Sequence, residues 1–308
     1  MLAPIQLRTL RAVLRTGSFA AAAAELSYTA SAVSQQMSAL ERASGLVLFE
    51  RSPHSVRPTA HAELLADRAA ELLATLAGLE REVAEIARGE VGRLRIGSFP
   101  TASARLLPSA LATLSAERPG IDIAVDEGEL DALLPRLLSG ELDLALAYRY
   151  QSVPAGWPEQ LVETVLLREP LSVLLPAGHR LAGSATLAGS ATPATLRLPA
   201  LAGERWVAPL AGSPGAVNLD RLAARAGFEP RIGFRSNDYS VVHGLVAAGL
   251  GVALVPGLGL TEVAGVRTLA LAGRPPRRTV LALHRPSARS SLLGAALAAI
   301  GSTAQLLK

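Results

Sequence analysis

The segment from Ala60 to Arg88 constrains the fold of this chain most, because it contains no proline and a single glycine, Gly78. Apolar residues recur in it at heptad spacing, in two interleaved series: Leu65, Leu72, Leu79 and Ile86, and Ala62, Ala69, Leu76 and Val83. This spacing predicts one long helix with an apolar seam, for which Thr59 would be the N-cap. One helix cannot bury such a seam alone. It must pack against a second chain or against its own C-terminal half.

Length and composition narrow the class of protein. A chain of 308 residues is long enough for two or three domains. No uncharged apolar run approaches the roughly 20 residues that span a bilayer, and arginines interrupt the N-terminal segment, unlike in an export signal. The absence of cysteine excludes disulfides and thiolate metal sites, and the five histidines lack ligand spacing. We expect a cytoplasmic protein without a metal or another cofactor.

Three short helical patterns precede the long segment, within residues 4–45. Gly17 would end the first helix, Ser18 would cap the second and Gly45 would end the third. In the third, Val33, Met37 and Leu40 fall on one side of a helical wheel and form its core face. The opposite side carries small hydroxyl, amide and guanidinium groups, on Ser31, Ser34, Gln35, Ser38 and Arg42.

Those opposite side chains can donate and accept hydrogen bonds at base edges and phosphates. The alternative is a three-helix bundle whose polar face contacts only water. The segment "LVLFERSPHSVRPT" then predicts a small hairpin with Arg51, His54 and Arg57 at its rim, which could lie against a phosphate backbone or in the minor groove. Residues 1–60 hold six Arg against three Glu, a net charge of +3, whereas residues 61–90 hold three Arg against seven acids, a net charge of −4. The N-terminal end is therefore the part suited to a polyanion.

The order "FAAAAAELSYTASAVSQQMSALERASGLVLFER" resembles the winged helix-turn-helix of the LysR-type transcriptional regulators. The resemblance implies that the third helix enters the major groove of double-stranded DNA and that the hairpin, the wing, contacts the flanking backbone. It maps these contacts to Thr29, Ala30, Ser31, Ser34, Gln35 and Arg51. Ala30 and Gln35 stand where the family often has Gln and Arg, so two long contacts are shortened or uncharged.

The same resemblance implies that two chains pair through the long helix. The product would be a homodimer, with dimers joining into tetramers as is common in the family, on a dyad-related operator. The pairing residues would be Leu65, Leu72, Leu76, Leu79, Val83 and Ile86.

Strands and helices alternate in the C-terminal half, which predicts a parallel α/β sheet. We expect strands at "RLRIG", "IDIAV" and "LDLALAY" with helices over 101–117 and 130–139, then a repeat of the pattern and a last helix from about Ser290. The segments "GELDLALA" and "LVAAGLGVALVP" resemble the LysR effector-binding domain, which is similar to type 2 periplasmic binding proteins. The expected domains are a winged helix-turn-helix over 1–59, a linker helix over 60–90 and an effector domain over 91–308. Its two Rossmann-like lobes would comprise about 91–163 with 268–308, and about 164–267.

A small-molecule effector would bind outside the carboxyl ends of the strands, in the crevice between the lobes. Thr101 lies near a helix N-terminus, where backbone N–H groups favour an anion or a carbonyl, although a simple capping role is the alternative. The candidate residues are Ser98, Phe99, Pro100, Thr101, Ala102, Glu127, Gly128, Tyr148, Ser213, Asn237 and Asp238. Lobe closure would turn about crossing segments near 148–166 and 262–274.

Two other classes of function are weaker. A pure solute-binding module would need an export signal and has no use for a basic helix-turn-helix. An enzyme would need a catalytic constellation, and no Ser-His-Asp order, Walker loop or metal cluster stands in a supporting context. The duplication "LAGSATLAGSAT", residues 181–192, predicts a surface loop. The sequence favours a DNA-binding regulator that responds to a ligand.

Overall fold

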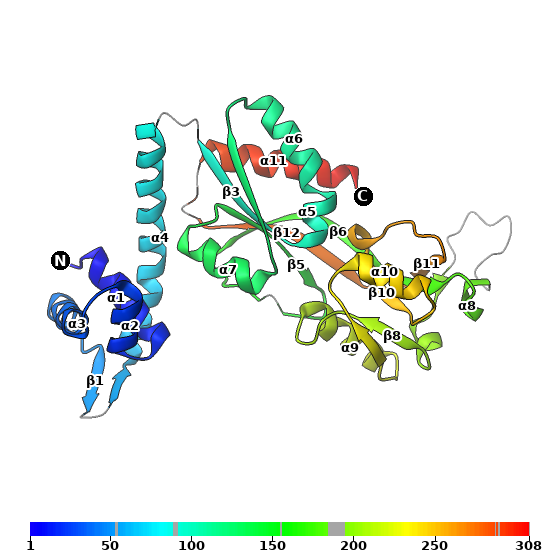
Figure 1. The fold of residues 1–308 in the computed structure, drawn as a ribbon, viewed down its shortest axis with the longest axis horizontal. Helices are drawn as coiled ribbons and strands as arrows, with labels where there is room; N and C mark the ends of the chain where they lie inside the picture. Colours follow the sequence, from blue (N-terminus) through cyan, green and yellow to red (C-terminus); the bar gives the residue numbers. More distant parts are fainter. Residues whose placement is uncertain are drawn as a thin grey trace. The chain divides into compact units, whose positions relative to one another are not determined.

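The computed structural model describes residues 1–52, 55–88, 92–154, 156–183, 195–286, 288 and 290–307. Within these ranges, only the backbone is described for residues 51, 52, 55, 56, 81, 82 and 84–88. The chain folds as two compact units, residues 1–93 with 135–142 and residues 94–134 with 143–308 (Figure 1). His54 and most of the "LAGSAT" duplication lie outside the described residues. No helix in the described ranges has both the length and the hydropathy of a bilayer span.

The first unit begins with three helices, α1 (Pro4–Thr16), α2 (Phe19–Leu26) and α3 (Ala30–Ser44). Their predicted ends are confirmed. Gly17 and Gly45 adopt the left-handed conformation, with φ of 75° and 69°, that glycine reaches without strain. The Oγ of Ser18 accepts a hydrogen bond from the backbone N–H of Ala21 at 3.0 Å. Leu7, Leu10, Val33, Met37 and Leu40 are buried together between the helices.

The predicted hairpin is confirmed as β1 (Phe49–Ser52) paired antiparallel with β2 (Ser55–Pro58). Glu41 of α3 fixes its base, because Oε1 of this residue accepts hydrogen bonds from the backbone N–H groups of Leu48 at 2.9 Å and Phe49 at 3.2 Å. Thr59 follows as the predicted N-cap of α4 (Ala60–Arg88), with its Oγ1 3.3 Å from the N–H of Ala62.

Helix α4 has two apolar faces. Ala62, Ala66, Ala69 and Leu73 are buried against the three-helix core. The heptad pattern places Ala62 and Ala69 in the apolar seam, although the residues expected to pair two chains begin at Leu65; the structure buries these two alanines within the unit. At 100° per residue they lie beside the leucine series rather than within it, and their small side chains let α4 approach α1 closely.

The second unit is built on one mixed sheet of eight described strands, in the order β4-β3-β5-β12-β6-β11-β7, with β10 also paired to β6. The strands are β3 (Arg93–Ser98), β4 (Asp122–Glu127), β5 (Leu144–Tyr150), β6 (Val162–Pro176), β7 (Thr195–Leu196), β10 (Ala253–Pro256), β11 (Val266–Leu271) and β12 (Arg277–His284). β8 (Arg205–Ala208) pairs in parallel with β9 (Arg231–Arg235), and a bridge from Trp206 to Val252 joins this pair to the segment before β10.

Strand β6 serves both lobes. Its Val162–Pro170 part pairs with β12, and its Leu171–Pro176 part pairs with β10 and β11. The charged residues Arg168 and Glu169 and the following Pro170 lie inside this continuous strand. Strand β11 pairs with β7 and with the second-lobe part of β6, so it belongs to the second lobe. The chain re-enters the first lobe at β12, which begins at Arg277, whereas the sequence placed this re-entry at about residue 268.

The remaining helices are α5 (Pro100–Arg105), α6 (Leu107–Glu117), α7 (Leu130–Ser139), α8 (Arg180–Gly183), α9 (Pro214–Arg225), α10 (Tyr239–Ala247) and α11 (Ser291–Leu306), with short 3-10 turns η1 (Leu198–Leu201) and η2 (Gly257–Gly259). One helix was predicted over 101–117, and this was wrong. The structure breaks it at Leu106, because Pro108 has no N–H and its ring would clash with the carbonyl four residues earlier.

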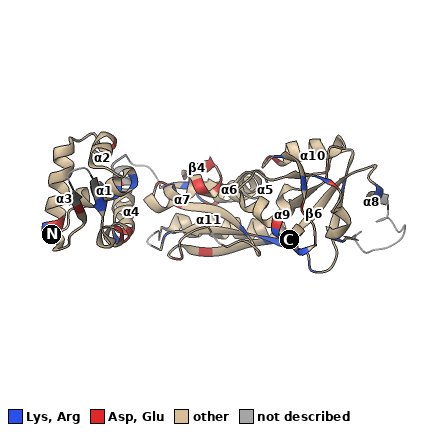
Figure 2. Ribbon diagram, turned by 90° about the horizontal axis from the view of Figure 1, so that it is seen from below, with Lys and Arg blue, Asp and Glu red and all other residues tan. Residues whose placement is uncertain are grey.

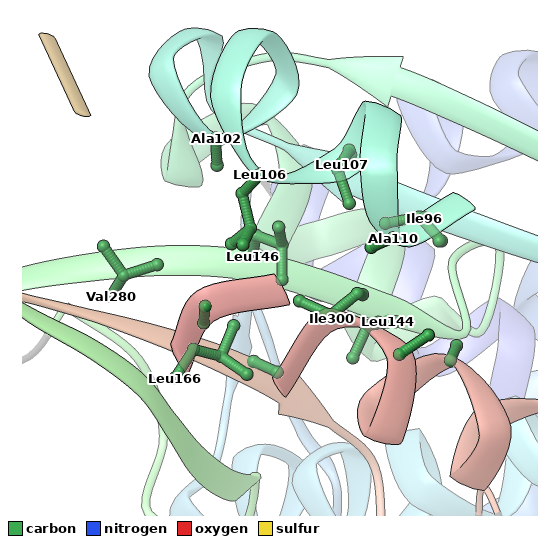
Figure 3. Packing of buried hydrophobic residues seen from close by; sticks show 14 of the residues in the cluster. Ile96, Ala102, Leu106, Leu107, Ala110, Leu144, Leu146, Leu166, Val280 and Ile300 are labelled. Carbon is green, nitrogen blue, oxygen red and sulfur yellow. The ribbon is translucent and has the colours of Figure 1, made fainter. Parts of the chain in front are cut away.

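The core of the first lobe lies between the sheet and the paired helices α6 and α11. Figure 3 shows Leu146 of β5 close to Leu106, and Leu144 of β5 close to Ile300 of α11. Leu106 points into the same cluster, so the helix break is packed rather than exposed. This core holds β3 and β5 in place, and their carboxyl ends carry the side chains of the candidate effector site.

Candidate functional site

Helix α3 presents a polar face outward. Val33, Met37 and Leu40 are each 0 % exposed, which fixes the rotation of the helix. Thr29, Ala30, Ser31, Gln35 and Arg42 are then exposed, and Ser34 and Ser38 are half-buried. Of these, the Oγ1 of Thr29 already accepts a hydrogen bond from the N–H of Ala32 at 3.1 Å, so its hydroxyl caps the helix. The exposed surface of α3 is thus the one that the helical wheel selected.

In the wing, Arg57 is the one basic residue whose side chain the structure describes. Arg57 of β2 is exposed. Arg51 lies on β1 opposite Val56, but its side chain and the whole of His54 lie outside what the structure describes. The described geometry therefore leaves Arg57 available for a backbone phosphate.

The second unit contains a cavity to which both lobes contribute. The first lobe, including its strands β5 and β12, supplies Phe99, Pro100, Thr101, Glu129, Tyr148, Tyr150 and Arg278. The second lobe supplies Pro209, Ser213, Gly215, Ser236, Asn237 and Tyr239. Its free volume is about 20 Å³, roughly the space that one water molecule requires. A ligand larger than water needs more room than this cavity has, which parting of the lobes would supply.

Six of the eleven effector candidates line this cavity: Phe99, Pro100, Thr101, Tyr148, Ser213 and Asn237. The other five do not. Ser98 and Ala102 are fully buried, because they point into the core behind the strand end. Glu127 is exposed at the end of β4, and Gly128 uses its N–H to bond the carbonyl of Ser98 at 2.9 Å. Asp238 caps α10 through the N–H of Ser240 at 2.8 Å.

Glu129 occupies the place expected for Glu127. Its Oε2 accepts a hydrogen bond from the hydroxyl of Tyr148 at 3.0 Å, within the first lobe. Its Oε1 accepts one from the Nδ2 of Asn237 at 3.4 Å, across the crevice. Burial and the nearby Glu129 charge raise the pKa of Tyr148, so its hydroxyl stays protonated and remains a donor. One carboxylate thereby links the two lobes.

Arg278, which lines the cavity, belongs to a buried ion pair with Glu169. Arg278 and Glu169 are 2 % and 3 % exposed, with Nε and Oε1 2.5 Å apart. The Nη2 of Arg278 also donates to the Oγ1 of Thr101 at 2.9 Å, and the guanidinium lies 5.2 Å from the ring centre of Phe99 and 5.0 Å from that of Tyr148. Burial alone would lower the pKa of Arg278, but the charge of Glu169 and neighbouring tyrosines raise it, so the guanidinium stays charged.

The sequence reasoning missed Glu129, Glu169 and Arg278. Glu169 follows Arg168 and Arg278 follows Arg277, so neither residue stands out in the sequence as a lone charge within an apolar strand. Because Glu169 and Arg278 are 109 residues apart, the pairing itself could not be read from spacing.

A winged helix-turn-helix, a long helix with an exposed apolar seam and a two-lobed α/β unit with a cavity define a DNA-binding protein that carries a ligand-binding domain. Comparison with family models agrees. Residues 5–63 match the bacterial regulatory helix-turn-helix protein model of the LysR family, and residues 87–305 match the LysR substrate binding domain. The chain belongs to the LysR family.

Curated relatives are regulators. The chain is 34 % identical over 245 residues to the small neutral protease regulatory protein of Streptomyces coelicolor, which covers 79 % of this chain and 70 % of that protein. It is 31 % identical over 291 residues to a probable hydrogen peroxide-inducible genes activator of Streptomyces viridosporus, covering 93 % and 89 %. Since these 308 residues include no cysteine, cysteine oxidation cannot be the signal that they sense.

Solved structures share the fold. A full-length OxyR variant from Pseudomonas aeruginosa superposes with a TM-score of 0.60 at 22 % identity over 99 % of this chain and 95 % of the other. Full-length CbnR in complex with its target DNA superposes with a TM-score of 0.55 at 22 % identity over 98 % and 100 %. With the family established, the chain is a DNA-binding transcriptional regulator with an effector-binding domain, and its partners are operator DNA, an effector and further copies of itself.

Proposed function

We propose that α3 reads the operator directly, through the side chains of Ser31, Ser34 and Gln35, with Ala30, Ser38 and Arg42 at the edges of the contact. The observation that carries this proposal is the complete burial of Val33, Met37 and Leu40, which leaves the hydroxyl and amide face of the helix to solvent. Short side chains reach few base edges, so the direct code is modest and DNA shape supplies part of the specificity.

The wing holds the phosphate backbone beside α3. Arg57 supports this role because it is exposed and cationic, and we assign Arg51 and His54 the same role from their places in the hairpin. Contacts of this kind strengthen binding to all sequences alike and make it sensitive to salt.

Helix α4 joins two chains. Leu72, Leu79 and Val83 are 57 %, 56 % and 56 % exposed in the single chain, which is unusual for large apolar side chains in a regular series. Leu65 and Leu76 belong to the same series and are half-buried. Ile86 is the next residue at heptad spacing after Leu79. Two recognition helices in such a dimer would address two half-sites of a dyad-related operator.

The effector binds in the cavity between the lobes, against the six candidates that line it and against Glu129 and Arg278. We retain 1–59, 60–90 and 91–308 as the functional domains. The protein acts in the cytoplasm, where its DNA is, and we assign it no catalytic activity, in keeping with a family of transcriptional regulators.

A gel-shift titration tests the assignment of α3. Gln35→Ala should relax specificity at one base pair per half-site and reduce the preference for the operator by about 1–3 kcal/mol. Arg57→Gln, as the contrasting variant, should weaken operator and scrambled DNA by the same factor and make binding less sensitive to salt. DNA from upstream of the gene of this protein is the first operator to try. If the unchanged protein binds scrambled DNA equally well, the proposal fails; if Gln35→Ala keeps full specificity, the assigned face is wrong.

A further inference from the structure

Two of the residues that line the cavity between the lobes are charged, Glu129 and Arg278. The charge of Arg278 is balanced by Glu169, because the Nε of the guanidinium lies 2.5 Å from the Oε1 of that carboxylate and both residues are almost fully buried. Glu129 is the remaining charge. Its own partners therefore decide the net charge that the cavity presents to a ligand.

The partners of Glu129 are neutral. The hydroxyl of Tyr148 and the Nδ2 of Asn237 donate hydrogen bonds to its two carboxylate oxygens, at 3.0 and 3.4 Å. In the part of the chain that the structure describes, Glu129 forms no ion pair. The residue is half-buried, so water reaches its charge only in part, and a carboxylate in such a place gains from a counter-ion. The cavity thus presents one unbalanced negative charge.

The residues beside Glu129 in the sequence are also acidic. The stretch "DEGELD", residues 126–131, holds four carboxylates in six residues. Figure 2 shows red segments at β4, which ends within this stretch at Glu127. These neighbours favour the approach of a cation to the first-lobe side of the cavity over the approach of an anion.

Aromatic side chains form much of the remaining wall. The chain has four tyrosines, and three of them, Tyr148, Tyr150 and Tyr239, line the cavity together with Phe99. Burial raises the pKa of Tyr150 and of Tyr239, so these hydroxyls stay protonated and neutral. Rings of this kind suit an apolar ligand body, and their faces attract cations, as the guanidinium of Arg278 near the rings of Phe99 and Tyr148 illustrates.

We propose that the effector is a small organic amine with an aromatic body. Its ammonium group pairs with Glu129, and its ring lies against the tyrosines. An organic acid fits less well, because it would place a second carboxylate beside Glu129 while the charge of Arg278 is already balanced by Glu169. The proposal rests on the assignment of the effector to this cavity, in which parting of the lobes supplies the room for the amine.

Isothermal titration of the full chain without DNA tests the charge of the ligand. The probes are 2-phenylethylamine, 2-phenylethanol and 3-phenylpropionate, which are a cation, a neutral molecule and an anion with the same ring and similar length. At neutral pH the amine should bind at least about tenfold more tightly than the alcohol, and the acid should bind more weakly than either.

Glu129→Gln removes the charge and keeps the shape of the side chain. It should weaken the amine by about tenfold or more and leave the affinity for the alcohol within about threefold, and this retained binding shows that the cavity is intact. Glu127→Gln is the matched control, since this carboxylate belongs to the same segment, is exposed and does not line the cavity. It should leave binding of the amine unchanged.

Gly215→Val identifies the place of binding. A Cβ at this position would lie 3.0 Å from the Cγ of Pro209 and 3.6 Å from the hydroxyl oxygen of Tyr150, so the valine occupies space at the cavity wall and should weaken every probe. If the acid or the alcohol binds at least as tightly as the amine and Gly215→Val weakens it, the effector site stands and the amine is overturned.

The remaining outcomes also decide. If Glu127→Gln and Glu129→Gln weaken the amine equally, Glu129 does not pair with the ligand and the proposal fails. If no probe binds at millimolar concentration, or if Gly215→Val leaves all binding unchanged, the assignment of the effector to this cavity fails together with the amine. A parallel gel shift without a probe tests the reading of DNA independently of these results.

Discussion

At the scale of single residues, the buried pair of Glu169 and Arg278 connects strand pairing to ligand binding. It joins β6 to β12, and the same guanidinium reaches Thr101 at the start of α5. A buried pair of this kind stabilises little by comparison with apolar residues of the same volume, but either member alone would be an uncompensated buried charge. The pair places the guanidinium of Arg278 at the cavity rather than adding much to stability.

Glu169→Ala should therefore lower the free energy of unfolding by about 3–5 kcal/mol, because it leaves the guanidinium of Arg278 buried without its counter-ion. Urea denaturation followed by circular dichroism measures the change. Arg231→Gln, at an exposed position, should change stability by less than about 0.5 kcal/mol.

The double substitution Glu169→Met/Arg278→Met sharpens this prediction. It should be less destabilising than Glu169→Ala, since it removes both charges and keeps apolar volume. A double variant as unstable as the sum of its two single variants would show that the charges do not act as a pair.

At the scale of elements, α4 shows how one helix serves two interfaces. Its alanine-rich face is narrow enough to pack on α1 within the chain, and the adjacent leucine series is left for a partner. The heptad pattern predicted an apolar helix but merged the two faces. Only the positions of α1 and α3 show which apolar residues are already covered.

Leu79→Asp should dissociate the dimer, because each chain would place a carboxylate in the seam where about 2–3 kcal/mol of apolar burial is expected per leucine. The dissociation constant should rise by about a hundredfold or more, as measured by sedimentation velocity at several protein concentrations. Circular dichroism should show that the helix content of the variant is retained.

Leu64→Asp is the matched control for that substitution. Leu64 is as exposed as Leu72, at 57 %, but lies about 80° around the helix from it. Its replacement should leave the dimer intact. Equal dissociation by both variants would show that pairing does not follow the leucine series.

At the scale of the whole ligand-binding unit, the lobes are linked by the backbone of β6 and by a hydrogen bond to the carboxylate of Glu129. β6 is continuous through both lobes and cannot part without losing strand pairing. The hydrogen bond from Asn237 to Glu129 can break while each lobe keeps its core. We expect the lobes to open by breaking this hydrogen bond, with the strand as the pivot.

Asn237→Ala should shift the lobes toward the open form, because it removes the hydrogen bond across the crevice and the acceptor for the N–H of Leu210. Hydrogen exchange should accelerate by about tenfold at Leu210 and rise at amides beside the cavity. Ser240→Ala, which affects only a local contact with Asp238, is the control. Unchanged exchange in Asn237→Ala would show that this contact does not hold the lobes closed.

The local pattern of the sequence determined the elements and the family. Helix caps at Gly17, Ser18, Gly45 and Thr59 depend on neighbouring residues alone, and so do helical and strand periodicities. The tertiary structure decided which side chains meet. Glu129 rather than Glu127 lines the cavity, Glu169 finds Arg278, and Ala62 turns inward, because each depends on elements brought together from distant parts of the chain. Such contacts carry no signal in spacing, whereas caps and periodicity do.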